Sequence, residues 1–99
     1  MAIRIEWHPD AVKDLAKIAK PERDRIRKTL FKLSELDDAR QRLEPYRAQL
    51  SGYWKLRTGN YRLVCEIVES SGKAILVILV AHRSMVYSPR NQNKAQSRK

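Results

Sequence analysis

The stretch "LSGYWKLRTGNYRLVCEI", residues 50–67, predicts two β-strands joined by a turn at residues 58–60. It is rich in aromatic and β-branched residues, which are typical of strands that pack against a core. Three cations interrupt this apolar pattern, namely Lys55, Arg57 and Arg62. Because the side chains of a strand alternate between its two faces, Lys55 and Arg57 share one face, and the return strand can bring Arg62 beside them. The hairpin therefore predicts a small sheet with a cationic patch.

This cationic patch has two interpretations. It can be a solvated surface of the sheet without any ligand. Like charges on neighbouring strands repel each other, however, so the arrangement is easier to explain if an anion binds among them. A phosphodiester suits such a site, because guanidinium groups hold its oxygens in pairs and stabilise the additional charge of a pentacovalent transition state.

The rest of the chain predicts one strand and two helices before the hairpin and one strand after it. Apolar residues alternate in residues 3–7 and recur at helical spacing in residues 12–19 and 26–36, with Pro21 between the two helices. Residues 74–81 are apolar throughout, as in a central strand covered on both faces. The predicted order β-α-α-β-β-β is an α+β fold, in which an N-terminal helical hairpin packs on one face of a small, mainly antiparallel sheet. The opposite face is expected to be open.

Length and charge indicate one domain with an anionic partner. Ninety-nine residues suffice for one core, and we assign the domain to residues 1–87. Residues 88–99 are basic and have no apolar periodicity, which predicts a disordered tail. The net charge is +10, and residues 51–99 contribute +7 of it, with 9 basic and 2 acidic residues. Such a field attracts nucleic acid or an acidic protein.

Other classes of protein and site are disfavoured by the sequence. No apolar run reaches the roughly 18 residues needed to cross a bilayer, and the N-terminus lacks the pattern of a secretory signal. Cys65 is the single cysteine, so it forms no internal disulfide, and we expect it in the core of a cytoplasmic protein. His8 and His82 lack partners at metal-ligand spacing, so neither a metal nor a small-molecule cofactor is expected. The chain has neither a phosphate-binding glycine loop nor a nucleophilic serine elbow.

In combination, the stretch quoted above and the later "ILVAHRSMVY" resemble the RelE/ParE superfamily of bacterial toxins. The shared features are a leucine-glycine entry, Arg-x-Gly at the turn, Tyr-Arg-Leu-Val on the return strand and His-Arg-x-x-Val-Tyr near the C-terminus. The resemblance covers residues 2–87. It implies a RelE/ParE-like (microbial RNase-like) fold and a cytoplasmic toxin that is neutralised by an antitoxin. With this net charge, we expect an acidic antitoxin segment to bind the open face of the sheet.

The superfamily divides by target, and the resemblance implies two functions. RelE-like members cut messenger RNA in the ribosomal decoding site, whereas ParE-like members inhibit DNA gyrase without nuclease chemistry. We favour a ribosome-dependent mRNA endonuclease, because the RelE-like catalytic positions are occupied here. They are Lys55, Arg62, Arg83 and Tyr87. A second lysine of the RelE group is replaced by Tyr53, which we expect to contact RNA together with Arg57.

The identity of the general base stays open. The segment "EPYRAQLSGYW" is similar to the YoeB branch, in which the glutamate at the position of Glu44 acts as a base. Alternatively, Glu44 is a turn residue before a proline and has no catalytic role. RNA supplies its own nucleophile, the 2′-hydroxyl, so the enzyme must align the strand, accept one proton, neutralise the phosphate and protonate the leaving oxygen. Permanently charged arginines suit the phosphate. Tyr87, Lys55 or Glu44 can accept the proton.

Overall fold

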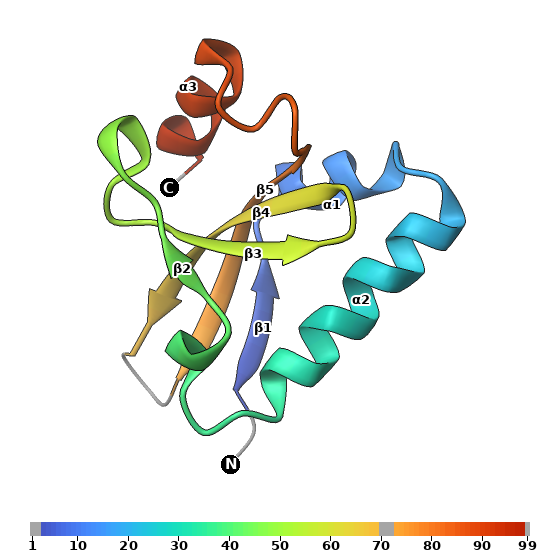
Figure 1. Cartoon of the computed structure of the whole chain (residues 1–99), viewed down its shortest axis with the longest axis vertical. Coiled ribbons are helices and arrows are strands. Elements are labelled where there is room, and N and C mark those ends of the chain that lie inside the picture. Colours follow the sequence, from blue (N-terminus) through green and yellow to red (C-terminus); the bar gives the residue numbers. More distant parts are fainter. Residues whose placement is uncertain (1–2, 70–72, 99) are drawn as a thin grey trace.

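The hairpin of residues 50–67 forms the antiparallel strands β3 (Trp54–Thr58) and β4 (Tyr61–Val68). In the computed structural model, which describes residues 3–69 and 73–98, these strands lie in the middle of a five-stranded sheet (Figure 1). Gly59 makes the turn between them with φ +61°, in the left-handed region. A Cβ atom at Gly59 would lie 2.7 Å from the end of the flexible Arg25 side chain, which can move, so the backbone conformation is the reason for glycine there.

The strand order of the sheet is β1-β5-β4-β3-β2, and only the β1–β5 pair is parallel. The remaining strands are β1 (Arg4–Trp7), β2 (Glu44–Pro45) and β5 (Ala74–His82). Strand β5 lies between β1 and β4, as the apolar sequence of this segment predicts, and nearly all of it is buried. The predicted α+β class and mainly antiparallel sheet are confirmed.

The helices α1 (Pro9–Ala16) and α2 (Lys20–Ser34) follow β1, and each begins with a proline in its first turn. Their apolar side chains, including Leu15 and Ile26, form the larger core with one face of the sheet, where Cys65 is fully buried as predicted. Val12 belongs to the predicted apolar stripe but is 50% exposed. Two short 3-10 helices follow, η1 (Ala39–Gln41) and η2 (Ala48–Leu50).

The prediction of a disordered tail is wrong, because Pro89–Ser97 forms a third helix, α3. Ser88 caps it by accepting a hydrogen bond from the backbone of Asn91, and Ala95 is fully buried against the sheet. Arg98, just beyond the helix, donates to Asp14 of α1 at 2.6 Å and is 9% exposed. The apolar content of this segment is low, so its helix depends on these tertiary contacts rather than on amphipathic periodicity.

The expectation of an open second face is correct for only part of the sheet. A second core packs there between the sheet, η2, the turn of residues 83–88 and α3. Val64, which alternation places on the open face, is fully buried in this core. The exposed remainder lies over β2, β3 and the adjacent end of β4, where the cations of the hairpin are found. No helix in the described part of the chain is long and apolar enough to cross a bilayer.

Candidate active site

A cleft of about 450 Å³ lies where β2 and β3 meet the turn of residues 83–88 and α3. Antiparallel pairing places Glu44 of β2 opposite Lys55 of β3, and the turn after β5 brings Tyr87 to the same place. Residues 44–55 and residues 87–92, which are far apart in the sequence, therefore meet here. The cleft is lined by Glu44, Pro45, Tyr46, Arg47, Ala48, Lys55, Tyr87 and Gln92.

Lys55 is the centre of this cleft. Its Nζ donates a hydrogen bond to the Tyr87 hydroxyl at 3.1 Å. The same ammonium lies 5.4 Å from the ring centroid of Tyr46 and 5.8 Å from that of Tyr87, within the range of cation–π attraction. The two rings meet edge to face at 5.9 Å. The pair of rings thus positions the amine against the hydroxyl of Tyr87, the more exposed of the two tyrosines.

Tyr46 differs from Tyr87 in what its hydroxyl can do. Tyr46 is buried, and its hydroxyl donates to the carbonyl of Leu63 at 3.3 Å. Burial raises the pKa of Tyr46 far above its ordinary value, so the phenol stays neutral at any physiological pH. Tyr46 therefore shapes the cleft, whereas Tyr87, 53% exposed, can meet a substrate.

Glu44 supplies the only carboxylate among the described lining residues of the cleft. Its Oε1 lies 3.2 Å from Nε of Arg57, and both side chains are about half exposed. Such an exposed pair contributes little stability and opens at small cost, so Glu44 is accessible as a proton acceptor and Arg57 as an anion-binding group. Both sequence-predicted residues thus lie at the cleft.

Arg62 and Arg83 lie together at the β3–β4 turn, beside the cleft rather than in its lining. The Arg62 guanidinium donates to the carbonyls of Gly59 and Tyr61 at 3.0 and 2.9 Å. Arg83 is exposed, and its backbone N–H donates to the carbonyl of Asn60 at 2.8 Å. Within residues 3–69 and 73–98, neither guanidinium forms an ion pair with an acidic residue. Two positive charges therefore remain uncompensated beside the turn.

The prediction that Tyr53 contacts RNA is wrong for this structure. Tyr53 is 4% exposed, and its hydroxyl donates to the carbonyl of Ala95 in α3 at 3.3 Å. Sequence alternation placed its ring on the face of Lys55, which is correct, but α3 covers that part of the face. Tyr53 therefore holds α3 against the sheet.

Sequence reasoning missed Tyr46, Arg47 and Gln92 of the cleft. Tyr46 and Arg47 follow the Glu44-Pro45 dipeptide, and this proximity in sequence to a candidate base could have indicated that they belong to the site. Gln92 had no sequence signal, because it comes from the segment that was expected to be disordered. Among the described residues, no three His, Cys, Asp or Glu side chains lie together as a metal site requires.

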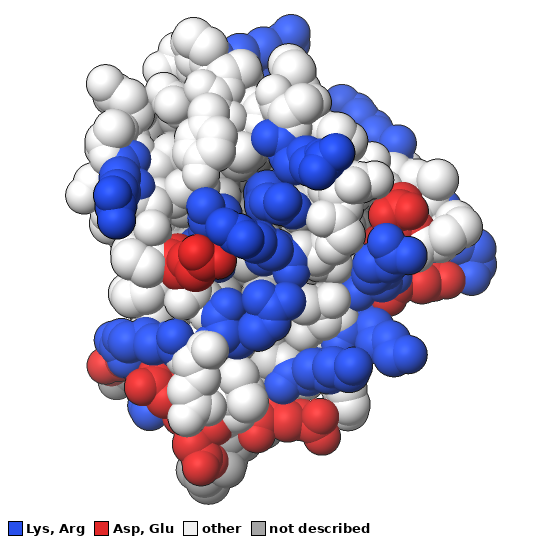
Figure 2. Space-filling view, in the orientation of Figure 1, with Lys and Arg blue, Asp and Glu red and all other residues white. Residues whose placement is uncertain are grey.

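Basic side chains gather on the face that carries the cleft. Figure 2 shows them across the middle of this face, over β2 and β3, while acidic side chains lie mostly at its lower end. Arg42 adds to this group by donating to the carbonyl of Arg57 at 2.9 Å. Such a surface attracts polyanions and provides charges that can neutralise a phosphate.

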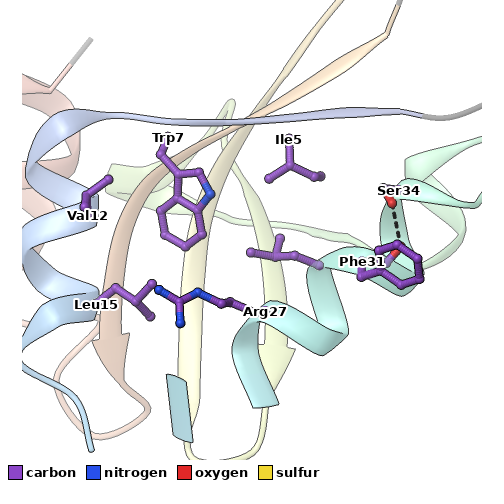
Figure 3. A pocket seen from close by; sticks show the side chains of 8 residues that line it. Ile5, Trp7, Val12, Leu15, Arg27, Phe31 and Ser34 are labelled. Atoms are coloured by element: carbon purple, nitrogen blue, oxygen red, sulfur yellow. Dashed lines mark hydrogen bonds between the residues drawn. The ribbon is translucent and has the colours of Figure 1, made fainter. Parts of the chain in front are cut away.

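A second groove lies between β1, α1 and α2 and has a different chemistry. It is mostly apolar, and Figure 3 shows Trp7, Leu15 and Arg27 pointing into it, with Phe31 at its margin. Phe31 is 65% exposed. Arg27 is the one charged residue among its described lining residues. The groove thus lacks acid–base groups and suits apolar side chains of a protein partner.

Comparison with known proteins agrees with this arrangement. A family model for the ParE toxin of type II toxin-antitoxin systems, parDE, matches residues 5–87. The chain belongs to the RelE/ParE toxin family. The resemblance seen in the sequence is therefore confirmed. No curated protein matches this toxin in a sequence comparison.

Solved structures of toxins share the fold. The toxin is similar to a chain of the RelBE2 toxin-antitoxin complex from Mycobacterium tuberculosis, with TM-score 0.73 and 24% identity, covering 85% of this chain and 94% of that chain. A doubly substituted Escherichia coli RelE in the free state gives TM-score 0.71 and 24% identity over 99% of this chain and 98% of that chain. The YoeB/ParE toxin from Agrobacterium tumefaciens gives TM-score 0.62 and 18% identity, covering 81% of this chain and 98% of that chain. These likenesses show the fold of the RelE/ParE toxin.

Proposed function

We propose that this RelE/ParE toxin is a ribosome-dependent mRNA endonuclease that stops translation in the cytoplasm. One observation carries the proposal: the Lys55 ammonium and the exposed Tyr87 hydroxyl are 3.1 Å apart in a cleft that also holds a carboxylate. A toxin that only binds a target protein does not require proton-transferring groups at hydrogen-bond distance. The unpaired arginines at the neighbouring turn add the charges that a phosphodiester needs.

The proposed step is a transesterification within the RNA. The 2′-hydroxyl attacks the adjacent phosphorus, the bond from phosphorus to the 5′-oxygen breaks, and a 2′,3′-cyclic phosphate and a 5′-hydroxyl result. Arg62 and Arg83 stabilise the negative charge of the pentacovalent transition state. The 2′ proton passes to a base in the cleft, and a second proton is delivered to the 5′-oxygen.

The Lys55–Tyr87 pair is our assignment for proton transfer. One partner of the pair must be deprotonated to accept the 2′ proton, and the other, still protonated, can then deliver a proton to the 5′-oxygen. Glu44 is the competing acceptor, and one of its oxygens lies 3.2 Å from Nε of Arg57. We propose that the ribosome aligns the RNA strand over this pair.

The deciding experiment is translation of a defined mRNA in a purified system, followed by primer extension. Cleavage of translated mRNA, with little cleavage of the same RNA without ribosomes, is the expected result. A supercoiling assay with DNA gyrase runs in parallel, because the matching family model is that of ParE, and gyrase inhibition is our second candidate. If the toxin blocks supercoiling by gyrase and leaves translated mRNA intact, it is a gyrase inhibitor and not a nuclease.

The toxin needs an antitoxin, and its surface suggests the chemistry of that partner. One structural neighbour is the RelBE2 toxin-antitoxin complex. We propose an acidic antitoxin that contacts the exposed basic part of the sheet and places apolar side chains in the groove at Trp7 and Phe31. Copurification of an acidic protein, with an affinity that falls as salt rises, is the expected observation. An affinity that does not depend on salt would contradict the electrostatic part.

A further inference from the structure

A third concave surface of about 370 Å³, here called the distal groove, lies at the end of β5 between the last turn of α1 and the first turn of α3. It shares a wall with the cleft. Met85 and Arg90 line the distal groove, whereas Tyr87 and Gln92 of the same turn and helix line the cleft. The two concave surfaces are thus neighbours, separated only by residues 83–88 and α3.

The distal groove is electropositive. Lys17, Arg90 and Lys94 line it, and none of the three forms an ion pair within the part of the chain that the structure describes. Asp14 is its one acidic lining residue, and the Arg98 guanidinium holds that carboxylate at 2.6 and 3.3 Å. The single negative charge is therefore compensated by a buried arginine, and the charges of the exposed Lys17 and Arg90 and of the half-buried Lys94 remain.

Two rings lie beside these cations. Tyr61 and His82 meet edge to face at 5.6 Å. The backbone N–H of Ser84 donates to Nδ1 of His82 at 3.2 Å, and the Ser84 hydroxyl lies 2.8 Å from the same nitrogen. Both rings belong to residues that line the distal groove. Cations for phosphates combined with rings for bases are the usual components of sites for single-stranded nucleic acid.

We propose that the distal groove binds the sugar-phosphate backbone and bases of an RNA strand that continues from the cleft. This inference rests on the proposed nuclease function and extends it from the cleavage site to the flanking nucleotides. Arg83 follows His82 directly in the chain and is hydrogen-bonded to the β3–β4 turn that carries Arg62. The turn at which Arg62 and Arg83 lie thus adjoins His82, which lines the distal groove. An acidic peptide could use the cations but would have no use for the rings.

The test measures binding without cleavage. A fluorescently labelled, single-stranded RNA of about ten nucleotides with 2′-O-methyl groups lacks the nucleophile and stays intact. Its affinity is measured by anisotropy over a series of salt concentrations for the wild type, for Arg90→Ala/Lys94→Ala and for Lys28→Ala/Lys32→Ala. The last variant is the matched control, because it removes the same charge from the exposed face of α2. Circular dichroism confirms that all three chains fold.

The distal-groove variant should bind roughly tenfold more weakly near 0.1 M salt, and the slope of log affinity against log salt should be shallower by about 1.4, or about 0.7 per lost phosphate contact. The control should keep the wild-type slope. Equal losses in both variants, or no loss in the groove variant, would overturn the proposal. The proposal would also be overturned if the binding of an oligoglutamate peptide, but not the binding of the RNA, requires Arg90 and Lys94. The partner of the distal groove would then be an acidic protein.

This design separates the distal groove from the nuclease proposal. A groove-specific loss of RNA binding supports the groove even if translated mRNA is not cut. If the toxin cleaves mRNA but the groove variant binds RNA as tightly as the wild type, the nuclease proposal is supported and the proposed role of the distal groove is overturned.

Discussion

At the scale of single residues, the proposed nuclease function depends on which side chain exchanges a proton and which ones neutralise charge. The structure separates these roles in space. Lys55 and Tyr87 touch each other in the cleft, while Arg62 and Arg83 lie at the adjoining turn. Substitutions can therefore remove one role and leave the other.

Tyr87→Phe keeps the ring beside Lys55 and removes only the hydroxyl. We expect single-turnover cleavage of translated mRNA to slow by about 10²–10⁴-fold, the usual contribution of a positioned acid or base, with ribosome binding unchanged. Glu44→Gln should have the smaller effect. If the order of the two effects is reversed, the base is Glu44 and Tyr87 only shapes the cleft.

Arg62→Ala removes a charge that the proposed mechanism requires when the phosphorane forms. The loss should be about 2–4 kcal/mol of transition-state stabilisation, which corresponds to roughly 10²–10³ in the cleavage rate. Arg83→Ala should behave alike, and Arg27→Ala in the apolar groove serves as the control. Full activity of both variants would show that these arginines lie on a solvated surface and have no role in cleavage.

Cys65 gives the toxin a dependence of stability on alkaline pH. Its complete burial raises the pKa of the thiol from 9.0 to about 12, so the unfolded chain releases this proton at a lower pH than the folded one. Stability is therefore fully present below about pH 9 and falls as the pH rises toward 12. Urea unfolding at pH 7 and pH 10.5 measures the loss. Cys65→Val should reduce this dependence on pH, and an unchanged dependence would show that other groups cause it.

At the scale of secondary-structure elements, α3 decides the shape of the site. It buries Tyr53, supplies Gln92 to the cleft and holds the preceding turn through the amide of Asn91, which donates to the carbonyl of Met85 at 2.8 Å. Its far end is fastened to α1 by Arg98, which also donates to the carbonyl of Ile78 at 3.0 Å. The position of Tyr87 thus depends on a contact at the other end of the helix.

Arg98→Ala leaves the carboxylate of Asp14 without its cation in a site that is 14% exposed. We expect a loss of about 3–5 kcal/mol in unfolding free energy and faster amide exchange in α3. Exposed Arg40, 3.2 Å from Glu69, is the control, and Arg40→Ala should cost less than about 1 kcal/mol. Equal costs for the two variants would show that α3 does not depend on its buried ion pair.

At the scale of the whole molecule, the toxin separates an apolar surface from a basic one. The groove of Trp7 and Phe31 lies on the helical side, and the basic face carries the cleft. A partner that covers both can bind tightly through apolar contacts and block RNA through charge. The strand β1 also lies at the edge of the sheet, where its outer side has no paired strand among the described residues.

Phe31→Asp tests this separation, because it places a charge in the apolar groove without touching the basic face. We expect antitoxin affinity to fall at least about tenfold, the effect of losing a buried aromatic anchor, with mRNA cleavage unchanged. Lys28→Asp on the same helix is the control for charge alone. If cleavage falls together with antitoxin binding, the groove also serves the ribosome or the fold.

Local pattern alone was sufficient for most of the fold. Alternation in residues 3–7 and 53–68 predicted the strands and the face that carries Lys55 and Arg57, because strand geometry assigns faces without reference to the rest of the chain. Proline positions predicted where the helices begin, for the same local reason. The toxin family also followed from the sequence, since its motifs lie in the hairpin and at the end of β5.

The tertiary structure decided what the pattern of residues 88–99 could not show. This segment has little apolar periodicity, so its helix forms only where Ala95 and Arg98 find burial and an ion partner far away in the sequence. That helix covers Tyr53 and half of a face that alternation alone leaves open. The contact of Lys55 with Tyr87, 32 residues apart, likewise arises only from the packing of β3 against the turn after β5. Distances between such side chains depend on long-range packing, which no local periodicity encodes.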